Sequence, residues 1–366
     1  MFDSRKLAEL LVELYRRQGP IAQEDEADLV ETAATNVIDV SYTVYEVELV
    51  DTKDVRLGNR FWGLDASVRT FRVTGIDIVI TTGALVGNRI VTVPGVVNTR
   101  WIAVRPRYVA DSEVKNILVE WSKVFYTCSR FIDEVFDGKF NEDVMKDEVR
   151  ISLENVLLNT WPGEGYLIID GPLFPTPRIL TRPDFRYSRV YLGLIKERVN
   201  ILKSRNFENK VISVVKRLSH SRYLAQMHGL SVTDDQAALL YTRDLLESSS
   251  RGVAYIGTLC IRVRVGDEEY EKYVGYLVKR THHVRHVVRI EALSEETLHE
   301  LKPYVAALLD PEGLPIPVHL ADRLCKDLSG GVYRYLWSVV PVDPTFESLE
   351  ELMLILSQER EEVSGI

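Results

Sequence analysis

The sequence predicts an α/β fold in which one mixed sheet is flanked by helices, and two observations carry this prediction. From residue 61 to about residue 107, segments with strand periodicity are separated by Gly and Asn, which is typical of neighbouring antiparallel strands. After this region, helical and strand periodicities alternate, which is typical of strands joined by helical crossovers.

The composition is that of a globular protein, with 46% hydrophobic and 27% charged residues among 366. The formal net charge of −9 argues against a protein that binds nucleic acid through bulk charge alone. Three distant cysteines without a C-x-x-C pair fit a reducing interior. We see no signal peptide and no apolar run of roughly 18 residues, so we expect a soluble, cytoplasmic protein without a membrane partner.

The first part of the chain is expected to contain helices and then strands. Gly19-Pro20 ends the first helix, and strands follow from residue 61. The predicted elements before the central strands are a helix at 4–17, a helix at roughly 24–36 and an extended segment at 41–50. After them come helices at about 111–136 and 143–159 and a strand that ends at Asp170.

The second part is expected to continue this alternation and to end in helices. The predicted elements are a helix at 188–203, a strand at Val211–Val215, a helix at 233–247, a hairpin of strands at about 252–265 and 270–280 that Val287–Ile290 extends, and helices near 294–308, 317–328 and 346–361.

The order of these elements predicts a more specific topology. Three strands, a helix, a strand, a helix and a strand follow one another, with carboxylates on the first and fourth strands. Right-handed crossovers through the helices would place the parallel strands side by side. This order describes an RNase H-like mixed sheet flanked by helices, with additional N-terminal helices and a C-terminal β-hairpin and helical extension.

Two strand ends suggest a metal site. An apolar run ends at Asp65, beside the small residues Ala66 and Ser67, and a second apolar strand ends at Asp170. Two divalent ions about 3.5–4 Å apart, held by carboxylates, can activate water and neutralise a phosphodiester. Oxygen ligands suit Mg²⁺ or Mn²⁺. A single Asp at a strand end more often caps a turn, but the pair in this order favours metal ligands.

Glu154 is the third candidate ligand. Its helical neighbours are apolar, and a buried carboxylate is costly without a compensating charge. A metal would supply this charge, and so would Arg150. Glu148 is the alternative, one and a half turns earlier and beside more polar residues. We favour Glu154.

The fourth candidate lies on the helix that begins near Pro317. His319 and Asp322 would share one face of this helix, either as a metal ligand with its supporting partner or as a surface pair without a role. Lys216, at the end of a strand, would pair with a carboxylate or contact a phosphate, or lie in solvent.

Other sequence features give weaker evidence for a catalytic or metal site, or none. His282 and His283 are consecutive, so on a strand they would point to opposite faces, and with His286 they fit a basic edge or a solvated loop better than a chelate. No G-x-S-x-G elbow supports a Ser-His-Asp triad. No Walker A loop is present, so we expect no ATP hydrolysis by this chain.

Several of these segments, in this order, resemble the motifs of the NurA nuclease family. Leu64-Asp65-Ala66-Ser67 resembles its first motif, and Glu154 with Asp170-Gly171-Pro172-Leu173 its second and third. The other similar segments are Val211 to Arg217 with Ser219 and Ser221, the hairpin Tyr273 to Leu277 with Val288 to Glu291, and Leu314 to Asp322. Each motif is short, and only the ordered set is specific.

The resemblance implies a toroidal homodimer that degrades DNA from 5′ to 3′ with Mn²⁺ or Mg²⁺, two ions per active site. It also implies a partner, the hexameric HerA ATPase, and a role in end resection at double-strand breaks, mainly in archaea. Asp65, Glu154, Asp170 and Asp322 would hold the metal, with Lys216 and His319 beside them. The implied organisation is an N-terminal dimerisation segment at 1–50, a nuclease domain at 51–345 and a C-terminal helix at 346–366.

Three positions depart from the family pattern. Ala66 replaces a Gly, Leu314 replaces a Tyr and Asp322 replaces a His. Asp322 can bind the same hard cation, with His319 one turn away as a substitute. Loss of both functions would instead leave a weak or inactive DNA-end clamp that serves the translocase, and an RNA-directed RNase H-like enzyme is a further alternative.

Overall fold

The computed structural model describes residues 3–20, 38–53, 55–56, 61–177, 180, 186–247, 252–265, 267–281 and 284–364. The helix expected at 24–36 and the pair His282-His283 lie outside these residues. Within the described ranges, no helix combines the length and the apolar character needed to cross a lipid bilayer.

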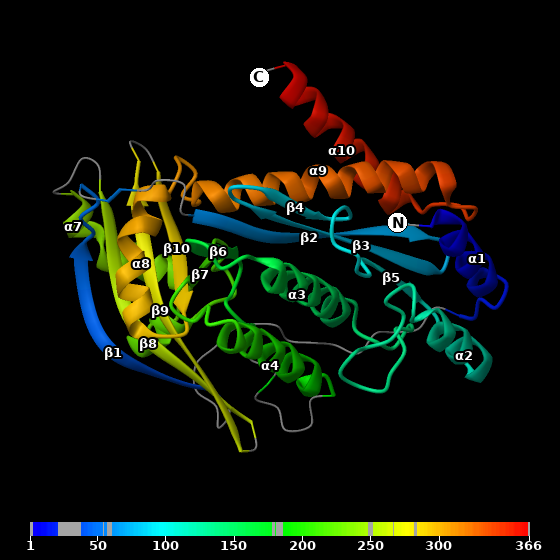
Figure 1. Cartoon of the computed structure of the whole chain (residues 1–366), viewed down its shortest axis with the longest axis horizontal. Helices are drawn as coiled ribbons and strands as arrows, with labels where there is room; N and C mark the ends of the chain where they lie inside the picture. Colours follow the sequence, from blue (N-terminus) through cyan, green and yellow to red (C-terminus); the bar gives the residue numbers. More distant parts are fainter. Residues whose placement is uncertain are drawn as a thin grey trace.

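One sheet of ten strands organises the described chain (Figure 1). Its strand order is β1-β8-β9-β10-β7-β6-β2-β3-β4, and β5 pairs with β3. The strands are β1 Ile38–Leu49, β2 Phe61–Val73, β3 Ile76–Val86, β4 Ile90–Val93, β5 Ile102–Pro106, β6 Tyr166–Asp170, β7 Val211–Val215, β8 Val253–Val265, β9 Glu268–Arg280 and β10 Arg285–Ala292.

Helices cover both faces of the central strands. In Figure 1, α9 lies along one side of β2 and β3, and α3 lies along the other side with α4 next to it. The helices are α1 Ser4–Tyr15, α2 Ser112–Trp121, α3 Glu142–Thr160, α4 Ser188–Ser204, α5 Tyr223–Met227, α6 Asp234–Tyr241, α7 Arg243–Glu247, α8 Glu295–Leu308, α9 Ile316–Val339 and α10 Phe346–Ser364.

The centre of the sheet is parallel, and this places two strand ends together. β2 pairs with β6 and β6 pairs with β7 in parallel, whereas β2 and β3 are antiparallel. Helix α3 leads into β6 and α4 leads into β7, as expected for crossover connections. The carboxyl ends of β6 and β7 therefore open toward the same edge, beside the interior of β2, which continues to Val73.

The long helix predicted at 111–136 is wrong, because α2 ends at Trp121. Tyr126 instead forms a bridge beside Ala103 of β5, and Cys128 forms a bridge with Val135. Phe125 and Tyr126 are buried in this extended arrangement. The aromatic and β-branched residues after α2 therefore gain more burial against the sheet than a continued helix would give them.

Two further differences concern the C-terminal half. Helix α9 continues past the predicted end at residue 328 to Val339, and Gly330 lies inside it, where a Cβ would come within 3.3 Å of Ile355 on α10. The small residue lets α10 pack closely on α9. Strands β8, β9 and β10 are not a separate extension, because β10 pairs with β7 and joins them to the same sheet.

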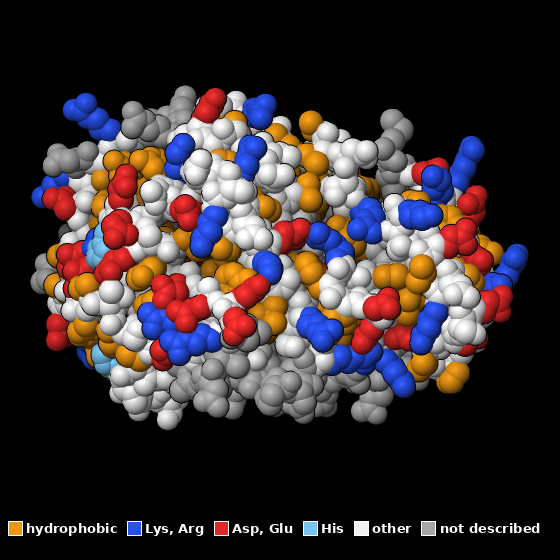
Figure 2. All heavy atoms as spheres, turned by 60° about the horizontal axis from the view of Figure 1, so that its bottom comes forward, with side chains coloured by type: hydrophobic (Ala, Val, Ile, Leu, Met, Phe, Trp, Pro, Cys, Tyr) orange, Lys and Arg blue, Asp and Glu red, His pale blue; other side chains and the backbone are white. Residues whose placement is uncertain are grey.

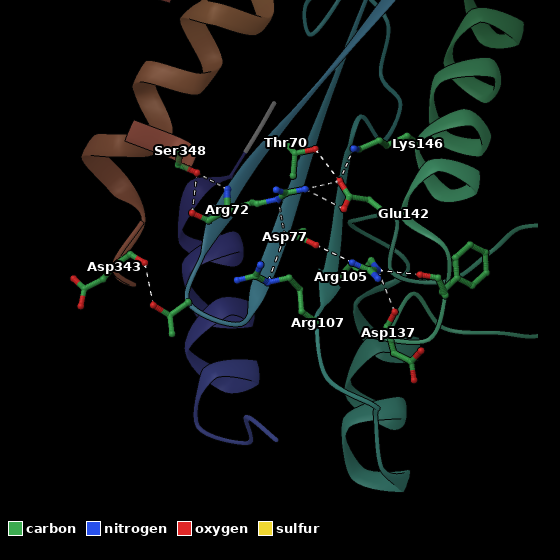
Figure 3. A network of polar contacts seen from close by, with 12 residues as sticks. Thr70, Arg72, Asp77, Arg105, Arg107, Asp137, Glu142, Lys146, Asp343 and Ser348 are labelled. Atoms are coloured by element: carbon green, nitrogen blue, oxygen red, sulfur yellow. Dashed lines mark hydrogen bonds and ion pairs between the residues drawn. The ribbon is translucent and has the colours of Figure 1, made fainter. Parts of the chain in front are cut away.

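A buried ion-pair network fixes the far end of β2 and β3 (Figure 3). Asp77 is fully buried and accepts a 2.8 Å hydrogen bond from Arg105, while Arg72 lies 3.5 Å from its other oxygen. Arg72 also donates to Glu142 at the start of α3. The network therefore links β2, β3, β5 and α3.

Asp77→Ala should lower the free energy of unfolding by about 3–5 kcal/mol, because the buried charge of Arg105 would lose the carboxylate that it contacts at 2.8 Å. Denaturant unfolding followed by circular dichroism measures this change. Glu113→Ala removes an exposed partner of Arg17 and should change the unfolding free energy little. Equal losses in both variants would contradict the importance assigned to the buried pair.

Candidate metal centre

Asp65 and Asp170 lie side by side because of the register between β2 and β6. Leu64 pairs with Ile169 in parallel, so the next residue of each strand emerges at the same edge. Asp170 is the last residue of β6, and both aspartates are less than 10% exposed, at 6% and 7%. The sheet thus brings together two acids that are more than a hundred residues apart in the chain.

Asp322 joins them from α9. One carboxylate oxygen from each of Asp65, Asp170 and Asp322 lies within 4.8 Å of the others. Gly63 makes this approach possible, because a Cβ at that position would come within 2.0 Å of the Pro317 carbonyl oxygen. The first turn of α9 therefore packs directly on the backbone of β2, which places Asp322 over the two strand ends.

Two lysines contact these acids. Lys216, just after β7, donates to Asp170 at 2.7 Å and to Asp322 at 3.3 Å. Lys326 donates to the other oxygen of Asp322 at 2.6 Å, one turn along α9. Asp65 has no side-chain ion pair among the described residues. It is therefore the acid that the protein itself neutralises least.

Glu154 lies near enough to Asp65 and Asp170 to act on their charges but is held by arginines. Arg150 donates to one of its oxygens at 2.7 Å and Arg198 donates to the other at 2.8 Å. Its charge repels those of Asp65 and Asp170. Glu148 points elsewhere and accepts hydrogen bonds from Ser129 and the Arg130 amide. Of the two glutamates, Glu154 is the one that the structure brings to the aspartates.

His319 does not join the cluster. Its Nδ1 lies 2.5 Å from Asp310, with Glu312 nearby, and it makes no contact with Asp322 among the described residues. The sequence placed His319 and Asp322 on one helix face. Asp310, on the loop before α9, draws the imidazole away from the metal centre.

Burial and like charges set the protonation of the aspartates. Burial, and then repulsion by Asp170, Asp322 and Glu154, raises the pKa of Asp65 to about 8. Burial also raises the pKa of Asp170, although Lys216 opposes this shift. At Asp322 burial is outweighed by Lys326 and Lys216, so its pKa is lowered. Positive charge therefore compensates Asp65 less than it compensates Asp322, and a bound cation would relieve this deficit.

Sequence reasoning named Arg150 as a possible partner of Glu154 but missed Lys326 and Arg198. Lys326 follows Asp322 by four residues, the same helical spacing as Arg150 and Glu154, so the sequence carried a signal for this pair too. Arg198 carried no such signal, because it lies on α4 and reaches Glu154 only in the folded chain.

The aspartates lie in a cleft of about 860 Å³ that also contains basic side chains. It extends along β2 from Asp65 to the start of α10. The basic residues in its lining include Arg69, Lys146, Arg150, Lys216, Arg217 and Lys326. Oxygen ligands beside cations are the combination that binds a divalent metal together with a phosphate.

In EDTA, Asp65→Asn should raise the melting temperature at pH 8 and have a smaller effect at pH 5. The pKa of Asp65 is about 8 in the folded chain against an ordinary value of 3.8. The folded state then binds the proton more tightly, so the free energy of unfolding falls as the pH rises from about 4 to 8. An Asn side chain does not ionise, so the variant avoids this fall in the free energy of unfolding, which should be on the order of 1 kcal/mol or more at pH 8.

Asp39→Asn is the control for this experiment, because it removes the same charge from an exposed position on β1. Scanning calorimetry at both pH values measures the melting temperatures. An Asp65→Asn variant that is no more stable than the wild type at pH 8 would rule out the proposed repulsion.

The chain is similar to proteins of one known family. A family model described as the NurA domain matches residues 42–327. No curated protein matches the chain. Among solved structures, the NurA nuclease from Sulfolobus solfataricus is 13% identical, with a TM-score of 0.39 over 93% of this chain and 99% of that one.

Two further structures are more distant in sequence. NurA with manganese is 9% identical, with a TM-score of 0.41 over 78% of this chain and 90% of that one. NurA bound to dAMP and manganese is 8% identical, with a TM-score of 0.37 over 86% of this chain and 88% of that one. The family model covers most of the chain, including β2, α3, β6, β7 and the first half of α9, and on this ground the chain belongs to the NurA family.

Proposed function

We propose that this protein is a metal-dependent deoxyribonuclease. The observation that carries the proposal is the convergence of three carboxylates from β2, β6 and α9 within 4.8 Å, at one end of a cleft lined by basic side chains. Membership of the NurA family supports the same activity. Phosphodiester hydrolysis is the reaction that best fits carboxylates for metal and cations for phosphate in one cleft.

The residues present fit a pair of divalent ions. Asp65, Asp170 and Asp322 would hold them, and Glu154 would complete the acidic set from α3. All these ligands are oxygens, so Mn²⁺ or Mg²⁺ is the expected ion. When bound, two such ions supply an activated water and stabilise the departing 3′ oxygen. The raised pKa of Asp65 supports this fit, because a nearby cation would offset both causes of it, the burial of the carboxylate and the repulsion by the other acids.

Three basic side chains would position these acidic metal ligands. Lys216 holds Asp170 and Asp322 at fixed distances and lies close enough to the cleft to contact a phosphate. Arg150 and Arg198 each hold one oxygen of the Glu154 carboxylate in an ion pair and so fix its position. Residues that fix the ligands in this way determine how well the metal is held.

The more specific parts of the proposal rest on membership of the NurA family. We propose cleavage from 5′ to 3′, in end resection at double-strand breaks, by a homodimer whose N-terminal segment, residues 1–50, contributes to dimerisation. A hexameric HerA-type ATPase would deliver the DNA. The order β4-β3-β2-β6-β7, with β2, β6 and β7 parallel, supports an RNase H-like arrangement of the catalytic strands in residues 51–345.

Local charge, not total charge, would bind the substrate. The face in Figure 2 shows basic and acidic side chains interspersed, which agrees with an overall charge of −9. Attraction of a phosphate backbone therefore has to come from particular cations such as those of the cleft.

One observation favours a second candidate function, a catalytically inactive DNA-end clamp. The Lys216 ammonium group already contacts two of the three aspartates. A lysine that neutralises these acids permanently would compete with a metal ion. The clamp would then keep the fold and the cleft of a nuclease without its reaction.

Asp65→Asn should abolish cutting of labelled linear DNA in Mn²⁺. The loss should exceed the roughly 10–100-fold effect of removing a residue that only supports a metal ligand. His319→Ala should cut like the wild type, because His319 pairs with Asp310 outside the cluster. A gel assay with DNA, RNA and hybrid substrates separates the deoxyribonuclease from an RNA-directed enzyme. DNA binding without cutting by the wild type would favour the clamp.

Removal of metal should stop the reaction reversibly. EDTA should abolish cutting by the wild type, and excess Mn²⁺ or Mg²⁺ should restore it, because the proposed ligands are all hard oxygen donors. Isothermal titration with Mn²⁺ measures the binding directly, with Asp170→Asn as a variant that removes a ligand. Undiminished cutting in EDTA would contradict the metal centre.

A further inference from the structure

One edge of β2 is open next to the metal centre. On this side β2 pairs with β6 only from Phe61 to Leu64, and among the described residues no strand pairs with it there until Pro344 bridges Val73. Ser348 of α10 closes the far end, since its hydroxyl bonds to both the amide and the carbonyl of Arg72. The edge between Asp65 and Arg72 is therefore free of strand partners.

The cleft follows this edge. Residues 65–70 of β2 line it continuously, from the aspartates to the first turns of α10. Alternate residues of a strand direct their backbone N–H and C=O groups to the same side. Since those of Arg72 face Ser348, those of Val68 and Thr70 face the cleft as well. The floor of the cleft thus offers backbone donors along about 13 Å of strand between Asp65 and Arg69.

Arg69 is the basic side chain on this edge that is best placed to exchange its partner. Its Nε donates to Ser329 on α9 at 2.9 Å, which fixes the guanidinium group at the wall of the cleft. Its Nη1 forms an ion pair with Glu351 of α10, whose side chain is 32% exposed. Water reaches this partly exposed carboxylate, so another anion can displace it from the pair.

The neighbouring Arg72 differs in this respect. It contacts the fully buried Asp77 and the Glu142 carboxylate at the start of α3, so it belongs to the ion-pair network that fixes the sheet. Figure 3 shows this arrangement around Asp77. Loss of those contacts would take one of the neighbouring cations away from the fully buried Asp77, which cannot turn to solvent. Arg69 therefore has the replaceable partner and Arg72 does not.

We propose that the polynucleotide strand that enters the metal centre continues along the open edge of β2, and that Arg69 binds one of its phosphates in place of Glu351. This inference rests on the proposed function. A phosphate oxygen can accept from the guanidinium group where one carboxylate oxygen of Glu351 accepts now. Glu351 thereby occupies the phosphate site when no strand is bound and weakens non-productive binding.

Binding of a labelled single strand of about 20 nucleotides, long enough to pass Arg69, tests the proposal by fluorescence anisotropy in EDTA. Arg69→Gln should weaken binding about fivefold or more at low salt, and the slope of log Kd against log salt should decrease by about 0.7, the value for one phosphate contact on a single strand. Arg69→Lys should retain most of this slope, which separates a charge effect from misfolding.

Glu351→Gln should tighten binding, and this gain should vanish in the Arg69→Gln background, because Glu351 acts through Arg69. Arg264→Gln and Glu269→Gln are matched controls, since they break an exposed ion pair on β8 and β9 with the same changes of charge. Both should bind like the wild type. A gain from Glu351→Gln that persists without Arg69, or equal losses in Arg69→Gln and Arg264→Gln, would overturn the proposal.

Because these measurements need no cleavage, they decide the path of the strand separately from the reaction. A wild type that binds through Arg69 but never cuts would refute the nuclease and still support the Arg69 contact. If the wild type cuts DNA and the Arg69→Gln variant binds and cuts like it, the nuclease is supported and the Arg69 contact is refuted.

Discussion

The repulsion among buried carboxylates is the constraint on which the rest of this structure depends. Asp65, Asp170 and Asp322 are held within 4.8 Å of one another at low exposure. Such an arrangement opposes folding, so it persists only because the backbone positions are fixed by other means. The parallel register of β2 with β6 fixes two acids, and the close contact of α9 with Gly63 fixes the third.

A second set of buried charges holds the loop that follows Asp170. The amide of Leu173 donates to Glu291, which pairs with Lys272, and the carbonyl of Leu173 accepts from Arg198, which pairs with Glu154. The loop after β6 is thus clamped between ion pairs from β9, β10, α3 and α4. Buried pairs are weak contributors to stability but strong determinants of position. Here they align Glu154 with the strand ends.

The sequence predicted the parts of the site that depend on local patterns. Asp65 and Asp170 both follow apolar strand residues, although β2 continues past Asp65 to Val73 whereas β6 ends at Asp170, and α3 begins and ends within a residue of its predicted bounds. It could not predict contacts that exist only after packing. The Arg198–Glu154 pair joins two helices, and His319 turns to Asp310 because of the loop before α9. The helix predicted at 111–136 failed for the same reason, since burial against β5 outweighed helical spacing.

The pairing of the cleft's cations explains how an acidic protein would bind a polyanion selectively. Lys216 is paired with Asp170, Lys326 with Asp322 and Arg150 with Glu154. These carboxylates neutralise the cations, so the cleft attracts phosphate weakly while its acids carry their full charge. Divalent ions on the same acids would reverse this balance and leave the cations to the phosphates. Metal binding and nucleic-acid binding would then favour each other by equal free energies, because such coupling is reciprocal. A cleft built in this way would discriminate against nucleic acid until it is loaded with metal, which a cleft of unpaired lysines would not do.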